Sequence, residues 1–353
     1  MRSAKSRITL GATLVGLVAV LLAVLVAPAM AAVTINGAGA TFPAPLYYKW
    51  ANDFKAKTGN KVNYQAIGSG GGISAIKAGT VLFGGSDTPL TTADLSASAL
   101  VQFPSCIGGV VPIVNLPGIS NGKLKLTGPV LADIYLGKIN TWNNAAIKAL
   151  NPGVNLPSSR ILVVHRSDAS GTSWIFTKYL SAVSGEWATK VGADKSVRWP
   201  VGVAGKGNEG VAALVKQSSG RIGYVEYAYS VQSRIPWAQM RNAAGKFVSP
   251  SLTSFSAAAA GASWSAANGF ATVMVNAKGA SSWPITGASF VIVKKSTGDY
   301  ATAHAMFQFW DWAYKSGRAD ASLLQYVSMP LKVVAAVEKV WHAQVKAGGK
   351  AAW

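Results

Sequence analysis

The sequence predicts an α/β fold in which two domains are joined by crossing strands. Short apolar runs of strand length alternate with stretches of helical periodicity along the whole chain, which is typical of an α/β architecture. Two apolar segments, 107–112 and 284–290, enclose a block of about 170 residues, enough for a domain of its own. We therefore expect one discontinuous domain, 32–110 with 283–353, and a second domain over 111–282.

The first 31 residues read as a signal peptide that is removed on export. Basic residues precede an apolar run over 8–26, Pro28 ends the run, and Ala29-Met30-Ala31 matches a small-residue cleavage signal. An uncleaved membrane anchor is the alternative, because the run is nearly long enough to span a bilayer. Cleavage would remove three positive charges and lower the net charge from +20 to +17. The prediction is an exported protein of the periplasm.

The composition limits the classes of partner. The chain has 33 Lys+Arg against 13 Asp+Glu, but the basic residues are scattered, with no aromatic-interleaved basic stripe for nucleic acid. An anionic partner and a generally cationic surface both remain open. The sequence contains no Walker A pattern and no Cys/His spacing for a metal, so we expect no cofactor and no metal. The single cysteine, Cys106, is expected to pack as a small hydrophobe.

The predicted strands and helices follow from periodicity. Five apolar runs are expected to be strands: 61–67, 81–87, 110–116, 161–167 and 289–295. Four helices are marked by apolar residues at helical spacing: Leu46, Trp50 and Phe54; Phe176, Tyr179, Leu180 and Val183; Met306, Phe309 and Ala313; Val333, Val337 and Trp341. Gly59 and Gly317 stand where the first and third of these helices should end.

Three glycine-rich segments open helices in the same way: "GAGATFPAPLYYKW" (37–50), "IGSGGGISAIKAG" (67–79) and "SDASGTSWIF" (167–176). Each places a hydroxyl and unpaired backbone N–H groups at a helix N-terminus, which attracts anions. The plainer interpretation of each segment is ordinary N-capping by Ser or Thr. Their recurrence, with an arginine inside the third, favours a tetrahedral oxyanion held by converging helix ends.

Strand alternation decides which side chains around the third segment cooperate. Arg166 and Asp168 share one side, so Asp168 can fix the guanidinium for an oxyanion, whereas His165 faces away. The same alternation disfavours a hydrolytic triad of His165, Asp168 and Ser170. His304 and His342 lie on predicted helices and remain possible partners for a catalytic serine, so a secreted hydrolase stays an alternative.

Asp87 ends the run "VLFGGSD", where a carboxylate beside an anion suits only an anion that carries a proton. The alternative is that Asp87 caps the turn before Thr88-Pro89. "GKGNEG" (205–210) fits a dinucleotide fingerprint but lies too deep in the chain, so we interpret it as another helix opening.

Long strings of the chain resemble a known family: "GAGATFPAP", "NYQAIGSGGG", "FGGSDTPL", "DIYLGKINTW", "RSDASGTS", "GKGNEG", "GYVEYAY" and "FWDWAYKSG". They are similar to the periplasmic phosphate-binding protein of the high-affinity phosphate ABC transporter (Pst system), in order over essentially the whole mature chain. The resemblance implies a two-lobed type II periplasmic binding protein, an α/β fold with a discontinuous first domain and the ligand cleft between its lobes. The net charge is higher than the family would suggest.

The resemblance also implies a ligand set and a role. Inorganic phosphate would be bound by Thr41, Phe42, Ser69, Asp87, Arg166, Ser170, Gly171 and Thr172, with Asp168 orienting Arg166 from behind. The protein would be a monomeric carrier without catalytic residues that delivers phosphate to the inner-membrane permease subunits of an ABC importer. A binding protein for another tetrahedral oxyanion, such as sulfate, and a secreted phosphoester or acyl hydrolase are the alternatives.

Overall fold

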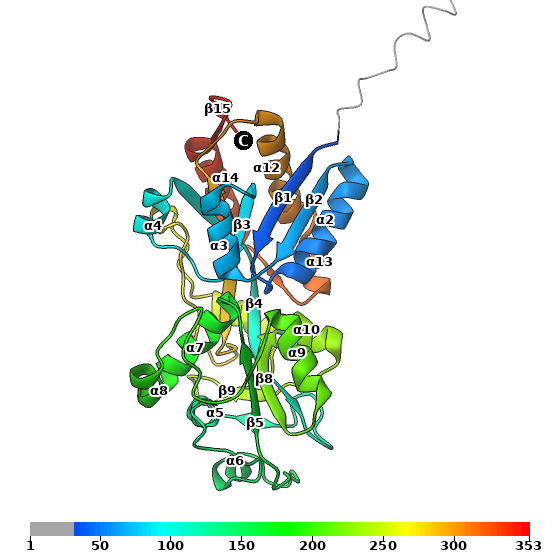
Figure 1. Cartoon of the computed structure of the whole chain (residues 1–353), viewed down its shortest axis with the longest axis vertical. Helices are drawn as coiled ribbons and strands as arrows, with labels where there is room; N and C mark the ends of the chain where they lie inside the picture. Colours follow the sequence, from blue (N-terminus) through cyan, green and yellow to red (C-terminus); the bar gives the residue numbers. More distant parts are fainter. Residues whose placement is uncertain (1–31) are drawn as a thin grey trace, which may run out of the picture.

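The structure, a computed structural model, describes residues 32–353 and shows two α/β lobes, one above the other along the long axis (Figure 1). The predicted signal peptide, 1–31, lies outside the described residues. Within 32–353, no helix combines the length and the hydropathy needed to cross a membrane. The predicted two-lobed α/β class is confirmed.

One mixed sheet runs through both lobes, with β13 as an added partner of β4. Its strands in spatial order are β2 (Lys61–Ala66), β1 (Thr34–Gly39), β3 (Phe83–Ser86), β11 (Thr286–Lys294), β4 (Leu100–Asn115), β8 (Arg221–Glu226), β6 (Leu162–Arg166) and β7 (Val203–Gly205), with β13 at Val327–Ser328. Two small sheets complete the β structure: β10 (Phe247–Val248), β9 (Gln239–Arg241) and β5 (Lys125–Leu126); β12 (Ser296–Thr297), β14 (Lys346–Ala347) and β15 (Lys350–Ala351).

Strand β4 is shared by the two lobes. Its first part, Leu100–Gly109, pairs antiparallel with β11, and its second part, Val110–Asn115, pairs antiparallel with β8 (Figure 1). Every residue of β4 except Asn115 is buried, as expected for a strand covered on both faces. The predicted strand 110–116 is therefore the end of a longer strand. The division of the chain at residues 110 and 282 stays a prediction.

Helices cover the sheet in both lobes. The upper lobe of Figure 1 contains α2 (Ala44–Thr58), α3 (Ser69–Ala78), α4 (Thr92–Ala97), α12 (Tyr300–Lys315), α13 (Arg318–Leu323) and α14 (Leu331–Gln344). The lower lobe contains α5 (Gly128–Tyr135), α6 (Ala145–Leu150), α7 (Gly171–Val183), α8 (Gly185–Lys190), α9 (Gly207–Gln217) and α10 (Tyr227–Ser233). Helix α11 (Leu252–Ala259) and the short 3₁₀ helix η1 (Ala266–Asn268) precede β11.

The four helices expected from periodicity are α2, α7, α12 and α14, and all four are confirmed. Helix α2 ends as predicted: Gly59 takes the left-handed conformation (φ 79°), and its N–H is bonded to the carbonyl of Lys55. The "GKGNEG" segment opens α9 at Gly207, so its interpretation as a helix opening is also confirmed.

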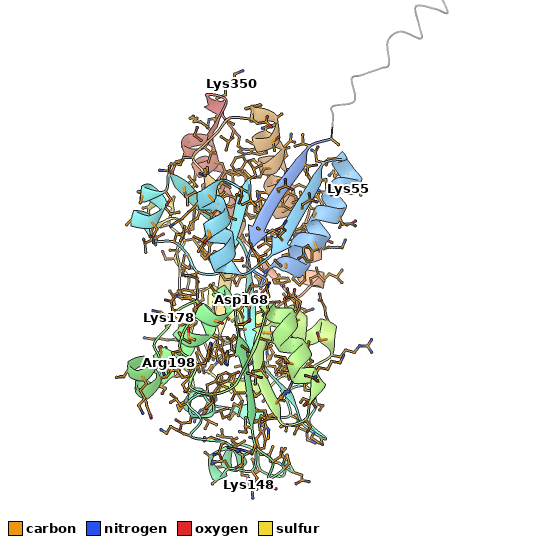
Figure 2. The ribbon with its side chains drawn as sticks, viewed as in Figure 1. Lys55, Lys148, Asp168, Lys178, Arg198 and Lys350 are labelled. Carbon is orange, nitrogen blue, oxygen red and sulfur yellow. The ribbon has the colours of Figure 1, made fainter. Side chains whose placement is uncertain are left out.

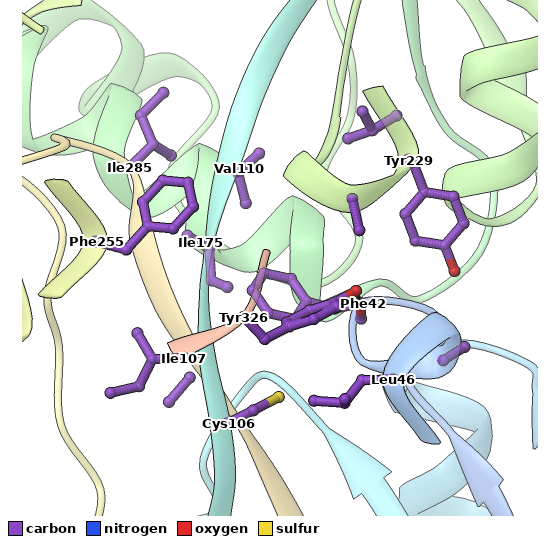
Figure 3. Close-up of a cluster of buried hydrophobic side chains, with 14 of the residues drawn as sticks. Phe42, Leu46, Cys106, Ile107, Val110, Ile175, Tyr229, Phe255, Ile285 and Tyr326 are labelled. Carbon is purple, nitrogen blue, oxygen red and sulfur yellow. Dashed lines mark hydrogen bonds between the residues drawn. The ribbon is translucent and has the colours of Figure 1, made fainter. Parts of the chain in front are cut away.

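The hydrophobic core is continuous across the junction of the lobes (Figure 3). Phe42 of the upper lobe packs edge-on against Tyr326, at 6.3 Å between ring centroids. Ile175 of α7 reaches the crossing strands, where a β-carbon on Gly287 would collide with it. Cys106 is fully buried in the same cluster, as predicted for a small apolar side chain. This packing places the N-termini of α2, α3, α7 and α9 around one point.

Candidate functional site

The two lobes touch where α3 and α7 begin. The N–H of Gly70 donates to the carbonyl of Ala169 across the junction (2.9 Å), and the N–H of Gly171 donates to Ser69 Oγ (3.1 Å). Glycine is required at position 171, because a β-carbon there would collide with Ser69 Oγ and Asp87 Oδ2. Asp168 lies at this waist in Figure 2. The structure therefore brings predicted residues of both lobes together.

Arg166 and Asp168 form the bidentate pair expected from the sequence. Arg166 donates through Nε to Asp168 Oδ1 (2.8 Å) and through Nη2 to Oδ2 (2.6 Å), and Oδ1 also accepts the N–H of Gly207 (3.0 Å). Partial burial raises the pKa of Asp168, but the hydrogen bonds and charge of Arg166 outweigh it and hold the pKa below its ordinary value. The guanidinium plane is thus fixed from behind by a charged carboxylate.

His165 points away from this pair, as strand alternation predicted. Its ring stacks on Trp199 at 4.9 Å between centroids, and its Nδ1 lies 3.1 Å from the carbonyl oxygen of Arg166. Half-burial lowers the pKa of His165, so the neutral imidazole is favoured. His304 and His342 bond to the carbonyls of Ala352 and Trp353 at the C-terminus. No histidine therefore serves Ser170 as a base in residues 32–353.

Two buried atoms on opposite sides of the junction have no hydrogen-bond partner among the described residues: Arg166 Nη1, a donor, and Asp87 Oδ2, an acceptor. The other Asp87 oxygen, Oδ1, accepts from Ser289 (2.8 Å). Burial raises the pKa of Asp87 to about 7, against the opposing effects of the Ser289 bond and the Arg166 charge. Nine other buried side-chain atoms of the described residues also lack a hydrogen-bond partner, but these two are a donor and an acceptor from different lobes at one junction, which indicates a site for a polar ligand.

The turn after β3 is capped by Ser86 and not by Asp87. Ser86 Oγ accepts the N–H of Thr88 (3.1 Å) and donates to the carbonyl of the same residue (2.7 Å). The alternative role of Asp87 as the turn cap is therefore wrong. Its carboxylate faces the junction of the lobes, where a β-carbon on Gly171 would reach Oδ2.

The hydroxyls at the helix openings make different hydrogen bonds. Ser170 is the N-cap of α7, accepting the N–H of Ser173 (3.1 Å), so the plain capping interpretation holds there. Neither α2 nor α3 has a side-chain cap. Instead, Ser69 Oγ accepts the N–H groups of Asp87 and Gly171 (both 3.1 Å). Both acceptor positions of Ser69 are occupied, so its hydrogen is available to another acceptor.

The first opening offers backbone donors. The amide N–H groups of Thr41 and Phe42 lie outside any helix or strand and donate to no acceptor within residues 32–353. Thr41, Phe42 and Thr172 are all buried, the first 3% exposed and the others fully enclosed. Each predicted ligand residue is therefore enclosed at the junction, with donors outnumbering acceptors.

Sequence reasoning missed several residues that support this site. Asn208 opens α9 and bonds to Thr41 and Thr172, and Ser289 of β11 bonds to Asp87. Glu226 is fully buried behind Phe42. Asn208 lies in "GKGNEG", which we interpreted from the sequence only as a helix opening. Glu226 ends the apolar run "GYVE", as Asp87 ends "VLFGGSD", and this shared pattern could have indicated it.

Burial raises the pKa of Glu226 well above its ordinary value, against the opposing hydrogen bonds from Tyr326 and the N–H of Ala228. The hydroxyl of Tyr326 lies 2.7 Å from both Glu226 Oε2 and the carbonyl oxygen of Phe42. Tyr326 donates toward both oxygens, and Glu226 Oε2 also accepts the N–H of Ala228 (2.9 Å). The raised pKa favours the protonated form of Glu226, which adds no negative charge next to Phe42.

Other features of the described residues lie apart from these. A surface groove of about 560 Å³ between α2, α9 and α10 is lined by Tyr48, Glu209, Lys216 and Tyr229 and contains none of the predicted ligand residues. No group of three or more His, Cys, Asp or Glu side chains within 32–353 is arranged to hold a metal ion.

The geometry, with two lobes enclosing buried polar groups, is that of a solute-binding protein, and the comparisons agree. The family described as "PBP superfamily domain" matches residues 26–316. The chain is 52% identical to the phosphate-binding protein PstS of Xylella fastidiosa (89% of this chain, 86% of the relative). It is also 52% identical to PstS of Pasteurella multocida (91% and 93%).

A solved structure shows the same fold. The high-affinity periplasmic phosphate-binding protein PfluDING, solved with bound phosphate, superimposes with a TM-score of 0.70 over 88% of this chain and 96% of its own, at 23% identity. With the matched family and relatives, the class is established as the two-lobed solute-binding proteins of the PBP superfamily. Within that class, the chain belongs to the family of the phosphate-binding protein PstS.

Proposed function

We propose that this protein captures inorganic phosphate between its lobes and delivers it to an ABC importer in the inner membrane. The observation that carries the proposal is the unpaired donor and acceptor buried at the junction, Arg166 Nη1 and Asp87 Oδ2. A phosphate that retains a proton satisfies both, because it accepts from the guanidinium and donates its O–H to the carboxylate. The names of the relatives support the same ligand.

The remaining predicted residues would complete the shell around the anion. Thr41 and Phe42 would donate through their amide N–H groups, and Ser69, Ser170 and Thr172 through their hydroxyls. Gly171, at the N-terminus of the 13-residue helix α7, adds the positive end of a helix dipole. These donors neutralise the anion by hydrogen bonds and dipoles, so the lobes can enclose it without water.

The wider role follows as part of the proposal. The protein would be a monomer of the periplasm, exported by residues 1–31 and made of a discontinuous domain (32–110 with 283–353) and a second domain (111–282). Closure on phosphate would present both lobes to the permease subunits. It would act as a carrier without catalysis, since Ser170 caps α7 and has no base.

Isothermal titration of phosphate-free protein tests the proposal. We expect tight one-to-one binding of phosphate, with sulfate at least a hundred-fold weaker, and phosphate present in protein purified without added phosphate. Equal binding of sulfate, or none of either anion, would refute it. Turnover of a chromogenic phosphate ester that is lost in Ser170→Ala would instead identify a hydrolase.

A further inference from the structure

We infer that Asn208 is a positioning residue of the anion site: it occupies both acceptor positions of the Thr41 hydroxyl and one of the Thr172 hydroxyl, so their hydrogens are left for the anion. This inference rests on the proposed phosphate site and adds a residue that does not touch phosphate itself. Asn208 belongs to α9 of the lower lobe and is fully buried, whereas Thr41 belongs to the upper lobe. It therefore donates hydrogen bonds to hydroxyls of both lobes, Thr41 in the upper lobe and Thr172 in the lower lobe.

The orientation of the Asn208 amide is fixed by its neighbours. Its Oδ1 accepts the backbone N–H of Glu226 (3.0 Å), a group that can only donate. The NH₂ end must then face the hydroxyls, where Nδ2 lies 2.7 Å from Thr41 Oγ1 and 3.2 Å from Thr172 Oγ1. A flipped amide would set its NH₂ group against the N–H of Glu226, and neither group can accept. The geometry allows one arrangement only.

The hydroxyl of Thr41 is left with a single option. Its oxygen accepts two hydrogen bonds from Asn208, one from Nδ2 and one from the backbone N–H (3.3 Å). A hydroxyl has two acceptor positions and one hydrogen, so both acceptor positions are used. Within residues 32–353, Thr41 Oγ1 donates to no acceptor. Its hydrogen is available for the anion next to its own unpaired N–H.

Thr172, in the lower lobe, is constrained less tightly, because Asn208 occupies one of the two acceptor positions of its hydroxyl. Its Oγ1 accepts the second Nδ2 hydrogen of Asn208 and donates to no acceptor in the described part of the chain. One amide group thus donates to hydroxyls of both lobes: it leaves the Thr41 hydroxyl only the donor role and turns the Thr172 hydrogen away from Asn208 before the ligand arrives. Preset donors need no reorientation on binding, so less of the binding free energy is lost in ordering them.

A double-mutant cycle measured by phosphate titration tests this role. Asn208→Ala should weaken phosphate binding about 10- to 100-fold, and Thr41→Val about 10-fold, as expected for losing a hydrogen bond to a charged ligand. If Asn208 acts through the Thr41 hydroxyl, the double variant should bind within about three-fold of the weaker single variant. Losses that multiply would show that Asn208 supports the site only structurally and would overturn the inference.

Asn208→Asp covers the case in which the alanine variant does not fold. It keeps the shape but puts an acceptor where Nδ2 stood, so both hydroxyls turn their hydrogens away from the anion. Adding Thr41→Val to it should cost no further affinity. A further ten-fold loss would contradict the inference.

Asn151→Ala is the matched control. Asn151 is a buried asparagine (4% exposed) that bonds the backbone of Lys125 and Ile147, away from the junction. Its loss should lower stability and leave phosphate affinity unchanged. If this control and the unaltered protein bind no phosphate, the proposed function fails; if they bind and the cycle is additive, only the role of Asn208 fails.

Discussion

Asp87 and Asp168 are two carboxylates of the proposed site, and their surroundings are opposite. Asp168, on the lower wall, is partly exposed and holds Arg166 through two hydrogen bonds, so its pKa is lowered. Asp87, on the upper wall, is buried with one bond from Ser289, so its pKa is raised to about 7. In the proposed phosphate site, this difference would let one carboxylate orient the arginine that attracts the anion and leave the other to accept the anion's proton.

Replacing Arg166, the charged donor of the lower lobe, should have the largest effect on phosphate affinity. In Arg166→Ala the anion loses its charged donor, and we expect a loss of about 4 kcal/mol, on the order of a thousand-fold in phosphate affinity by titration. His165→Ala is the control, because that ring stacks on Trp199 outside the site. It should bind phosphate within about two-fold of the unaltered protein. Equal losses of affinity in both variants would mean that the side chain of His165 also faces the site, contrary to the alternation along β6.

Asp87→Asn, in the upper lobe, should have a smaller effect, and this effect should appear in the selectivity for phosphate over sulfate. Sulfate carries no proton at neutral pH, so against Asp87 it places lone pairs and two negative charges in a dry site. The asparagine keeps the shape and supplies an N–H donor, so sulfate should compete about a hundred-fold better with phosphate, roughly 3 kcal/mol. Competition titrations with both anions measure it. If a folded Asp87→Asn protein excludes sulfate as well as the unaltered protein does, Asp87 does not recognise the proton of phosphate.

The residues around Asp87 and Arg166 also show how much of the site could be predicted from the sequence. Arg166, Asp168 and His165 were placed correctly because their relation is local: neighbours on a strand alternate and the pair is two residues apart. The glycine-rich openings were found for the same reason, since capping chemistry lies within a few residues of a helix start. The strands and helices followed from periodicity.

The supporting residues could not be found in this way, because their partners are distant in sequence. Asn208 meets Thr41 across 167 residues, Ser289 meets Asp87 across 202, and Tyr326 meets Phe42 across 284. No spacing rule connects such pairs before the chain folds. Tertiary packing also determines the length of β4, where the aromatic rings of Phe42 and Phe255 cover Gly108 and Gly109 and let a strand continue through a glycine pair.

The difference between the carboxylates should also appear in stability against pH, with the smallest effect. A carboxylate whose folded pKa is raised stabilises the protein fully below its unfolded pKa, and this contribution is lost as pH rises through the folded pKa. For Asp87 that window runs from 3.8 to about 7, so its contribution should fall by roughly 2–3 kcal/mol between about pH 5 and pH 8. Asp168 has a lowered pKa, so its contribution is lost only as pH falls below its unfolded value.

Urea unfolding of phosphate-free protein at these two pH values measures the effect. Asp87→Asn cannot titrate, so its free energy of unfolding should decrease less from pH 5 to pH 8 than that of the unaltered protein. His165 also titrates with a lowered pKa, but it is common to both proteins and its effect cancels in the difference. The charge of Asp87 raises the pKa of Glu226, so the difference also contains the loss of this coupling in Asp87→Asn. Asp53→Asn is the control, because Asp53 is paired with Lys49 on the surface of α2 and has a lowered pKa. It should keep the full slope. Equal slopes for Asp87→Asn and the unaltered protein would show that Asp87 is already ionised at pH 5, and the contrast between the two walls would then lie in geometry alone.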